Sequence, residues 1–245
     1  MTVGVVIQAR MGSTRLPGKV LKDLKGQTVL AHVVERVNQA SCIDQIIVAT
    51  TDLPEDDAIV DEVNRLNTMF FRGSEHNVLS RYAEAAKTFD LDTVVRITSD
   101  CPLIDPCVLD QLIQYYHDSS AALVTNAGPY EFKRTYPRGF DVEVFSNDVL
   151  QEANQYSTEN YQREHVTPYI YEDKHDVAYY QLSDDWSHYR LTLDTQEDFD
   201  VIKLVYDHLY QGRHDFYLAD IIRLLKAYPK IAERNQHIEQ KKLTE

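Results

Sequence analysis

The chain has 245 residues, of which 43% are hydrophobic and 26% are charged, so it can bury a substantial core. Its formal net charge of −14 argues against a nucleic-acid partner and an anionic membrane surface, because both attract basic proteins. No apolar run approaches the roughly 20 residues that span a bilayer, and residues 1–9 do not have the pattern of a signal peptide. The three cysteines, Cys42, Cys101 and Cys107, lack metal-binding spacing, and we expect reduced thiols in the cytoplasm.

Strands and helices alternate through the first half of the sequence. Apolar runs predict strands at residues 3–9, 43–50, 68–71, 93–98 and 121–125. Periodic apolar stripes predict helices after Thr28, at residues 55–66, after Asn77 and from Pro106. This alternation is typical of a doubly wound, mainly parallel sheet, so the expected fold class is α/β.

The pattern changes after residue 126. Residues 139–145 alternate as in a half-buried antiparallel strand, and residues 177–182 and 188–193 also predict strands. Thr195-Gln196-Glu197-Asp198 fits a capping box, and a last helix is expected at about residues 217–226. We therefore predict one domain over residues 1–228, with an inserted segment at 128–182. The polar tail, residues 229–245, is expected to be weakly ordered or to pack on a partner.

A cationic loop follows the first predicted strand and ends at Lys19. Its two glycines leave backbone N–H groups that can point at anionic oxygens, and Arg10, Arg15 and Lys19 supply positive charge. Val20 follows Lys19, so the loop is not a P-loop, and it also lacks the dinucleotide-binding glycine pattern. An ordinary strand-to-helix turn with solvated charges is the alternative. The density of glycines, hydroxyls and cations on an acidic chain favours phosphate binding.

Two aspartates also follow predicted strands. Asp100 lies just after residues 93–98, and Asp194 follows residues 188–193 and precedes a helix. Ligands of open parallel sheets bind outside the carboxyl ends of the strands, which places Asp100 at the same edge as the cationic loop. A carboxylate beside a polyphosphate needs a cation between them, and Mg²⁺ is the usual one. A turn residue before Pro102 and a helix cap at Asp194 are the alternatives, and the two aspartates together favour a metal site.

The segment Gln8-Ala9-Arg10-Met11-Gly12-Ser13-Thr14-Arg15-Leu16-Pro17-Gly18-Lys19 resembles the opening signature of the CMP-sugar-acid synthetases, which include the KDO and acylneuraminate cytidylyltransferases. It is most similar to their spore coat polysaccharide branch, the SpsF-like proteins. The resemblance continues through residues 96–104, 136–144, 163–168 and 191–198, to about residue 209. It implies a GT-A-like fold and transfer of a cytidylyl group from CTP to a sugar acid. It also implies a cytoplasmic homodimer in surface or spore-coat polysaccharide synthesis.

The resemblance further implies roles for individual residues. Asp100 and Asp194 would bind Mg²⁺, and Arg10, Arg15 and Lys19 would surround the triphosphate. Within that group, Lys19, Arg15 and Asp100 would be catalytic, with Lys19 at the α-phosphate and Arg15 at the β/γ end. The other nucleotide-binding candidates are Ala9, Met11, Gly12 and Ser13 in the loop, and Gly73, Ser74 and Arg81 in a base-reading segment. That segment departs from the form found in the KDO enzymes, and a turn glycine at Gly73 with a solvated Arg81 is the alternative.

The inserted segment would supply part of the acceptor site. A sugar acid needs a cation for its carboxylate, and Arg138, Arg163 and Thr98 are the candidates. A salt-bridge network at a subunit interface is the alternative for the two arginines. Cys101 adjoins Asp100, but displacement at phosphorus needs no enzyme nucleophile, and we expect a small buried thiol.

Two other functions stay open at this stage. A glycosyltransferase of the same fold usually carries an Asp-x-Asp motif, whereas Cys101 and Pro102 follow Asp100 in this chain. A non-catalytic homologue would bind a nucleotide or a sugar without turnover.

Overall fold

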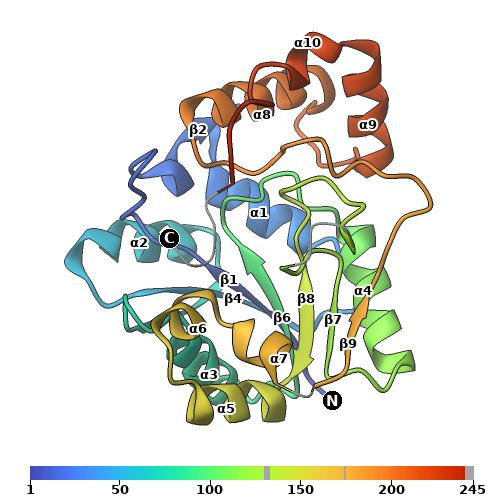
Figure 1. Ribbon diagram of the computed structural model, residues 1–245. Coiled ribbons are helices and arrows are strands. Elements are labelled where there is room, and N and C mark those ends of the chain that lie inside the picture. The colour runs from blue at the N-terminus through green and yellow to red at the C-terminus, as the bar shows by residue number, and fades with distance from the viewer. Residues whose placement is uncertain (130–132, 174, 241–245) are drawn as a thin grey trace.

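A central sheet organises the chain in the computed structural model, which describes residues 1–129, 133–173 and 175–240 (Figure 1). Within these residues seven strands form one sheet in the order β5-β4-β1-β6-β8-β7-β9, and β2 and β3 form a separate hairpin. The strands are β1 Val3–Gln8, β2 Asp23–Leu24, β3 Gln27–Thr28, β4 Gln45–Thr51, β5 Met69–Gly73, β6 Thr93–Thr98, β7 Leu123–Thr125, β8 Glu143–Ser146 and β9 Val177–Tyr179.

The sheet is parallel in its first half and mixed in its second. β5, β4, β1 and β6 run parallel, β8 is antiparallel to both β6 and β7, and β9 is parallel to β7. This arrangement confirms the predicted α/β class, with a parallel sheet that is extended by an antiparallel strand from the inserted segment. The β2–β3 hairpin was not predicted from the sequence.

Helices connect and cover the strands. They are α1 Val29–Val37, α2 Asp57–Arg65, α3 Val78–Thr88, α4 Pro106–Asp118, α5 Asn147–Tyr156, α6 Asn160–His165, α7 Pro168–Glu172, α8 Gln196–Leu209, α9 Leu218–Ala227 and α10 Pro229–Ala232, with short 3₁₀ turns η1 Lys19–Leu21 and η2 Pro54–Asp56. The predicted caps are present: Thr28, Asn77 and Thr195 each accept a backbone N–H from the first turn of their helix. Among the helices of the described residues, none is long and apolar enough to cross a membrane.

The apolar core lies on both faces of the sheet, because successive side chains of a strand point to opposite faces. Val5 and Ile7 pack with residues of α1, α2, α4, α8 and α9, whereas Val6 packs with residues of α3, α5 and α7. Figure 1 shows α3, α5, α6 and α7 together on one side and α8, α9 and α10 grouped at another part of the molecule. The parallel strands β5, β4, β1 and β6 thus have their carboxyl ends at one edge of the sheet, between two helical layers.

Residues 188–193 do not form the strand that the sequence predicts. Within the described chain their backbone makes no regular pairing with a neighbouring strand, only an isolated β-bridge between Arg138 and Arg190. The chain beside them is Arg138-Gly139, and Gly139 has a φ of 98° and lies so close that a Cβ atom would be 2.4 Å from the carbonyl oxygen of Leu191. Glycine is therefore needed at this crossing, and the tight contact replaces a regular ladder.

The polar tail is also different from the prediction, at least as far as residue 240. α10 follows α9, and Asn235 is only 1% exposed. Its amide donates to the Arg190 carbonyl at 3.0 Å and to the Asp198 carboxylate at 2.8 Å. The tail is thus packed on its own domain, because its polar side chains satisfy buried groups there. Residues 241–245 of the predicted tail lie outside the described residues.

Candidate functional site

The candidate site lies where the order of the parallel strands reverses. From β1 the chain continues outward through β4 and β5 on one side, and β6 returns to the other side of β1. Open α/β sheets bind ligands at such a switch point, outside the carboxyl ends of the strands. The cationic loop leaves β1 at this point and Asp100 follows β6, so the structure brings these two predicted features together.

The loop is held in a fixed shape while some of its donors stay available. The Gly18 N–H donates to the Met11 carbonyl at 3.1 Å, and the Met11 N–H donates to the Asp56 carboxylate at 2.7 Å. Gly18 has a φ of 65°, which suits glycine and turns the chain into η1. The backbone N–H groups of residues 12, 14 and 15 have no acceptor within the part of the chain that the structure describes. This is the arrangement expected of an anion-binding loop.

The remaining loop predictions concern contacts that need a ligand to be seen. Ala9 is buried, and its N–H donates to the Ala49 carbonyl at 3.1 Å, so it continues the strand pairing. Arg10 and Arg15 are partly exposed, with side chains 45% and 38% accessible. Ser13 uses its backbone N–H for the Met11 carbonyl at 2.8 Å. Nucleotide contact by these residues stays a prediction.

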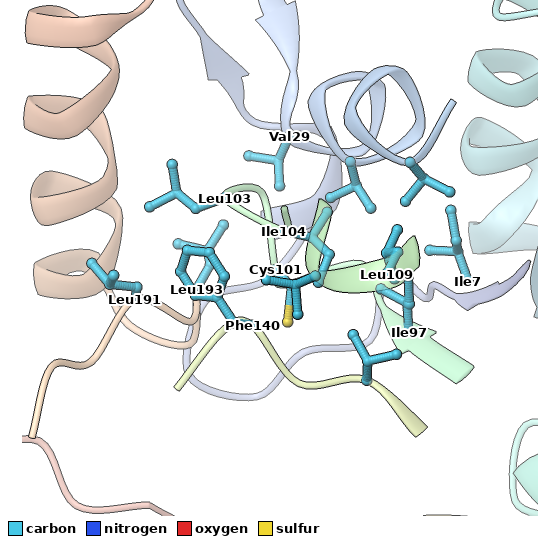
Figure 2. Packing of buried hydrophobic residues seen from close by; sticks show 14 of the residues in the cluster. Ile7, Val29, Ile97, Cys101, Leu103, Ile104, Leu109, Phe140, Leu191 and Leu193 are labelled. Carbon is cyan, nitrogen blue, oxygen red and sulfur yellow. The ribbon is translucent and has the colours of Figure 1, made fainter. Parts of the chain in front are cut away.

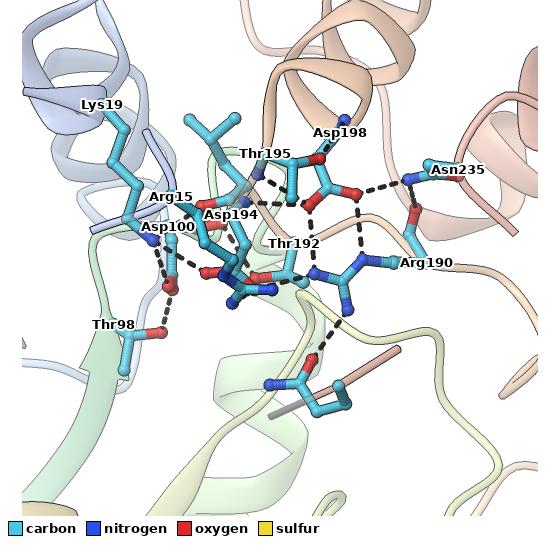
Figure 3. Close-up of polar contacts among 12 residues, drawn as sticks. Arg15, Lys19, Thr98, Asp100, Arg190, Thr192, Asp194, Thr195, Asp198 and Asn235 are labelled. Carbon is cyan, nitrogen blue, oxygen red and sulfur yellow. Dashed lines mark hydrogen bonds and ion pairs between the residues drawn. The ribbon is translucent and has the colours of Figure 1, made fainter. Parts of the chain in front are cut away.

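Lys19 joins the two predicted metal-binding aspartates (Figure 3). Its Nζ donates to Asp100 Oδ2 at 2.9 Å, to Asp194 Oδ1 at 3.0 Å and to the Leu193 carbonyl at 2.7 Å. Burial by itself would lower the pKa of Lys19, but the two carboxylates outweigh it and raise that pKa. Burial would likewise raise the pKa of Asp100, and Lys19 together with the Thr98 hydroxyl holds it below its usual value.

Asp194 is surrounded by positive charge. Besides Lys19, it contacts Arg190 Nη2 at 2.8 Å and Arg15 Nη2 at 3.2 Å, both through Oδ2. Arg190 is itself fixed by Asp198, at 2.9 Å from Nε to Oδ1, and this carboxylate is fully buried. Figure 3 shows these side chains converging from the two ends of the sequence.

Sequence reasoning missed Arg190, Asp198 as an ion-pair partner, and Asn235. A signal was present for the first two, because Arg190 and Asp194 are four residues apart and Asp198 is the fourth residue of the predicted capping box. Thr195 and Asp198 make the helix cap, so Asp194 is not needed for capping. Nothing near Asn235 in the sequence distinguishes it.

The donor set fits a hard divalent cation. Asp100 Oδ2 and Asp194 Oδ1 both lie within 3.0 Å of one cationic atom, and the Leu193 carbonyl faces the same atom. Carboxylate and carbonyl oxygens are the ligands that Mg²⁺ prefers. The two aspartates are therefore the residues that could hold such a cation in place of Lys19, and metal binding by them stays a prediction.

The predicted base-reading segment follows β5 at the same edge of the sheet. Arg81 is 2% exposed, which corrects the alternative of a solvated helix residue, and its Nη1 donates to the Ser74 carbonyl at 2.9 Å. Ser74 Oγ also accepts the Asn77 N–H at 3.0 Å. Gly73 is closely packed, since a Cβ there would lie 3.3 Å from the Arg81 side chain. Arg81 thus positions the segment from beneath, and contact with a nucleotide base stays a prediction.

The three sugar-binding candidates do not form one cluster. The Thr98 hydroxyl donates a hydrogen bond to Asp100. Arg138 lies beside Asp141. Burial by itself would raise the pKa of Asp141, but Arg134 and Arg138 outweigh it and lower that pKa. Arg163 is exposed on α6, and its guanidinium donates to the Ser157 carbonyl at 3.2 Å. The described contacts of Arg163 are therefore local to the α5–α6 connection and do not link it to Asp100.

Cys101 is buried, as expected, and lies among apolar side chains such as Ile97, Leu103 and Phe140 (Figure 2). Burial, together with the neighbouring Asp100, raises the pKa of its thiol well above the usual value. A thiol in this state is a poor nucleophile, because the thiolate is the reactive form.

Known proteins of similar structure and sequence show the family of this chain. The structure is similar to that of a cytidylyltransferase from Leptospira borgpetersenii, with a TM-score of 0.89 and 36% identity, covering 98% of this chain and all of the other. The fold is thus that of the nucleotidyltransferases. A sequence model of the cytidylyltransferase family matches residues 4–242, and the chain belongs to this family.

Two curated relatives extend the comparison. The chain is 32% identical to the spore coat polysaccharide biosynthesis protein SpsF of Bacillus subtilis, over 94% of this chain and 97% of that protein. It is 37% identical to the 3-deoxy-manno-octulosonate cytidylyltransferase of Trichlorobacter lovleyi, over 46% of this chain and 44% of that protein. The predicted family and fold class are confirmed, and the match reaches beyond residue 209 into the tail.

Proposed function

We propose that this protein transfers a cytidylyl group from CTP to a sugar acid and releases pyrophosphate. The observation that carries the proposal is the convergence of Asp100 and Asp194 on Lys19, beside an anion-binding loop at the switch point of the sheet. A hydroxyl of the sugar acid would attack the α-phosphorus in line and lose its proton, and the bond to the pyrophosphate oxygen would break. Membership of the cytidylyltransferase family supports the choice of CTP.

The chain's own charges would do most of the work. A triphosphate competes with Asp194 for Arg15 and Lys19, because its charge is greater than that of a carboxylate. Arg190 stays bound to Asp198 and so keeps the Asp194 carboxylate oriented. Asp100 and Asp194 would then hold Mg²⁺, which neutralises phosphate charge and orients the phosphate when it is bound.

The relatives support a narrower choice of acceptor and pathway. Similarity to SpsF supports surface or spore-coat polysaccharide synthesis. The partial similarity to a 3-deoxy-manno-octulosonate cytidylyltransferase supports a 2-keto-3-deoxy sugar acid, for example an acylneuraminate-like nonulosonate. We include a homodimer in the proposal, on the basis of the aromatic content of residues 128–182.

Pyrophosphate release from CTP, Mg²⁺ and a panel of sugar acids tests the reaction. Asp100→Asn and Lys19→Ala are each expected to lower kcat/KM by about 100-fold or more, as removal of a transition-state contact does. Matched controls are Asp90→Asn, at an exposed position with a φ of 50° that asparagine also adopts, and Lys87→Ala, at an exposed position of α3. Undiminished turnover in the first two variants would contradict the mechanism.

Binding separates this reaction from a non-catalytic role. CTP should raise the melting temperature more than CMP does, and the difference should depend on Mg²⁺. Stabilisation by CTP without pyrophosphate release from any acceptor would instead indicate a binding homologue.

A further inference from the structure

A second buried charge network lies where β6 and β8 run side by side. Arg96 and Glu143 are paired in register across these strands, and Arg96 Nη1 donates to Glu143 Oε2 at 2.6 Å. The other carboxylate oxygen accepts the hydroxyls of Thr167 at 2.9 Å and Tyr171 at 2.6 Å. Glu143 is buried, and these donors compensate its loss of water. We call these four residues the Glu143 network.

The guanidinium of Arg96 is less fully used than the carboxylate. It has five N–H donors in a planar fork. Its one other hydrogen bond in the described chain is from Nη2 to Gln8 Oε1, at a long 3.3 Å, and its buried Nε has no partner there. The side chain is 17% exposed and lies over the Tyr82 ring. The network therefore gives both carboxylate oxygens of Glu143 a hydrogen-bond donor and leaves N–H donors of the Arg96 guanidinium unused within the described chain.

Arg96 lies next to the candidate site. Arg96 and Thr98 point to the same face of β6, about 7 Å apart along the strand. Thr98 contacts Asp100, and Gln8 is the last residue of β1 before the cationic loop. Arg96 thus lies on the strand that leads to Asp100, two residues before Thr98, and its partner Glu143 comes from the inserted segment.

A strained turn holds the network together. Val166 is fully buried at φ 73° and ψ −56°, a conformation that is costly for a β-branched residue. The Thr167 N–H donates to the His165 carbonyl at 2.9 Å, which closes a γ-turn. The turn directs Thr167 toward Glu143 and starts α7, which carries Tyr171. Strain of this kind persists where the surrounding structure requires it, and it clusters at binding sites.

We infer that Arg96 binds the carboxylate of the acceptor and so selects a sugar acid over a neutral sugar. A planar guanidinium can grip both oxygens of a carboxylate. Glu143 already offsets part of its charge, so a singly charged carboxylate suits the position better than a doubly charged phosphate does. The inference rests on the proposed function and assigns the part of the chain that recognises the substrate class.

The test compares acids with matched neutral acceptors. The acceptors are 3-deoxy-manno-octulosonate and N-acetylneuraminate, each beside its carboxamide, with CTP as donor. Because Arg96→Gln alone leaves Glu143 buried without a cation, the key variant is Arg96→Gln with Glu143→Gln, which removes both charges. Arg223→Gln, at an exposed arginine, is the control.

The KM for the acid is expected to rise about 10-fold or more in the double variant, while the KM for CTP and for the carboxamide changes less than about 2-fold. The KM of Arg96→Lys for the acid should lie between those of the wild type and the double variant, because lysine keeps the positive charge but lacks the planar guanidinium. A folded double variant that still prefers the acid overturns the inference, and so does a wild type that uses acid and carboxamide equally.

Wild-type protein that is stabilised by CTP and Mg²⁺ but turns over only neutral sugars overturns the acceptor assignment alone. Wild-type protein that neither binds CTP nor releases pyrophosphate with any acceptor overturns the proposed function as well.

Discussion

The two charge networks of this protein are built in opposite ways. The network around Asp194, which we call the Asp194 network, joins Arg15, Lys19 and Arg190 to the carboxylates of Asp100, Asp194 and Asp198. The Glu143 network joins one guanidinium to one carboxylate and adds two hydroxyls. The first network lies beyond the end of β6, and the second lies along it.

The difference lies in which groups are free to change partner. In the Asp194 network, Arg15 is 38% exposed and reaches Asp194 at 3.2 Å, so a phosphate can compete for it. Asp198 and Arg190 form its fixed part, because the Asp198 side chain is fully buried. In the Glu143 network the carboxylate is fixed and only the guanidinium keeps donors for a ligand. An arginine that can leave its carboxylate partner, as in the Asp194 network, suits a polyphosphate ligand. A guanidinium that is held in place and keeps N–H donors, as in the Glu143 network, suits a carboxylate ligand.

Removing the fixed part of the Asp194 network should have the largest effect on stability. Asp198→Asn leaves Arg190 buried without its main partner and weakens bonds to two backbone N–H groups. We expect the free energy of unfolding to fall by about 3–5 kcal/mol, measured by urea denaturation with Asp90→Asn as the control. A loss below about 1 kcal/mol would show that the two networks are not distinguished by a fixed core.

In the Glu143 network, Glu143→Gln should cost about 2 kcal/mol, because the amide cannot accept from Arg96 and from both hydroxyls at once. Adding Arg96→Gln should recover part of that loss, since the pair then carries no unmatched charge. The same urea measurements on both single variants and the double variant form the cycle. A double variant whose loss equals the sum of the single losses would mean that the pair is not coupled.

Arg15, which can exchange its carboxylate partner for a phosphate, should affect ligand binding more than stability. Arg15→Ala is expected to raise the KM for CTP about 10-fold, while the free energy of unfolding changes by less than about 0.5 kcal/mol, because exposed ion pairs contribute little. Pyrophosphate-release kinetics and urea denaturation give the two numbers. If stability falls as much as in Asp198→Asn, Arg15 belongs to the fixed part.

The smallest expected effect is on the acid side of the pH–stability curve. The pKa of Asp100 is lowered from its usual 3.8, so its pairing with Lys19 stabilises the fold above that value and is lost as the pH falls below it. The stability difference between wild type and Asp100→Asn should therefore shrink as the pH falls from about 5 to below the usual 3.8. A difference that grows toward low pH would reverse the assigned direction.

Local chemistry explains which parts of the site could be predicted from the sequence. The loop that ends at Lys19, and Asp100 after its strand, concentrate their signals within a few neighbouring residues. The contacts of Asn235 with Arg190 and Asp198 span 45 and 37 residues, and no local pattern encodes such a pairing. The sequence therefore predicts Asp100, Asp194 and the loop cations of the Asp194 network, but not Arg190, Asp198 and Asn235, which hold them in place.

The sequence predicts the fold well in the parallel part of the sheet, where strands and helices alternate along the chain. Residues 93–98 were predicted as a strand and form β6 with the same bounds. Residues 188–193 have a strand-like alternation as well, but Gly139 brings one close backbone contact to them in place of a ladder. A solvated Arg81 is an alternative at the level of sequence because charged residues on helices are usually exposed. Its burial depends on the packing of Gly73 and Ser74 against it, which the local sequence does not show.

The contacts of Asn235 and Gln240 with Arg190 also set an order of events during synthesis. The cationic loop is translated well before Asn235 and Gln240. The pair of Arg190 and Asp198 can form without these two residues, but its surroundings are complete only once they have been translated. The last contacts of the network are therefore made after the loop, the strands and α8 have all been synthesised.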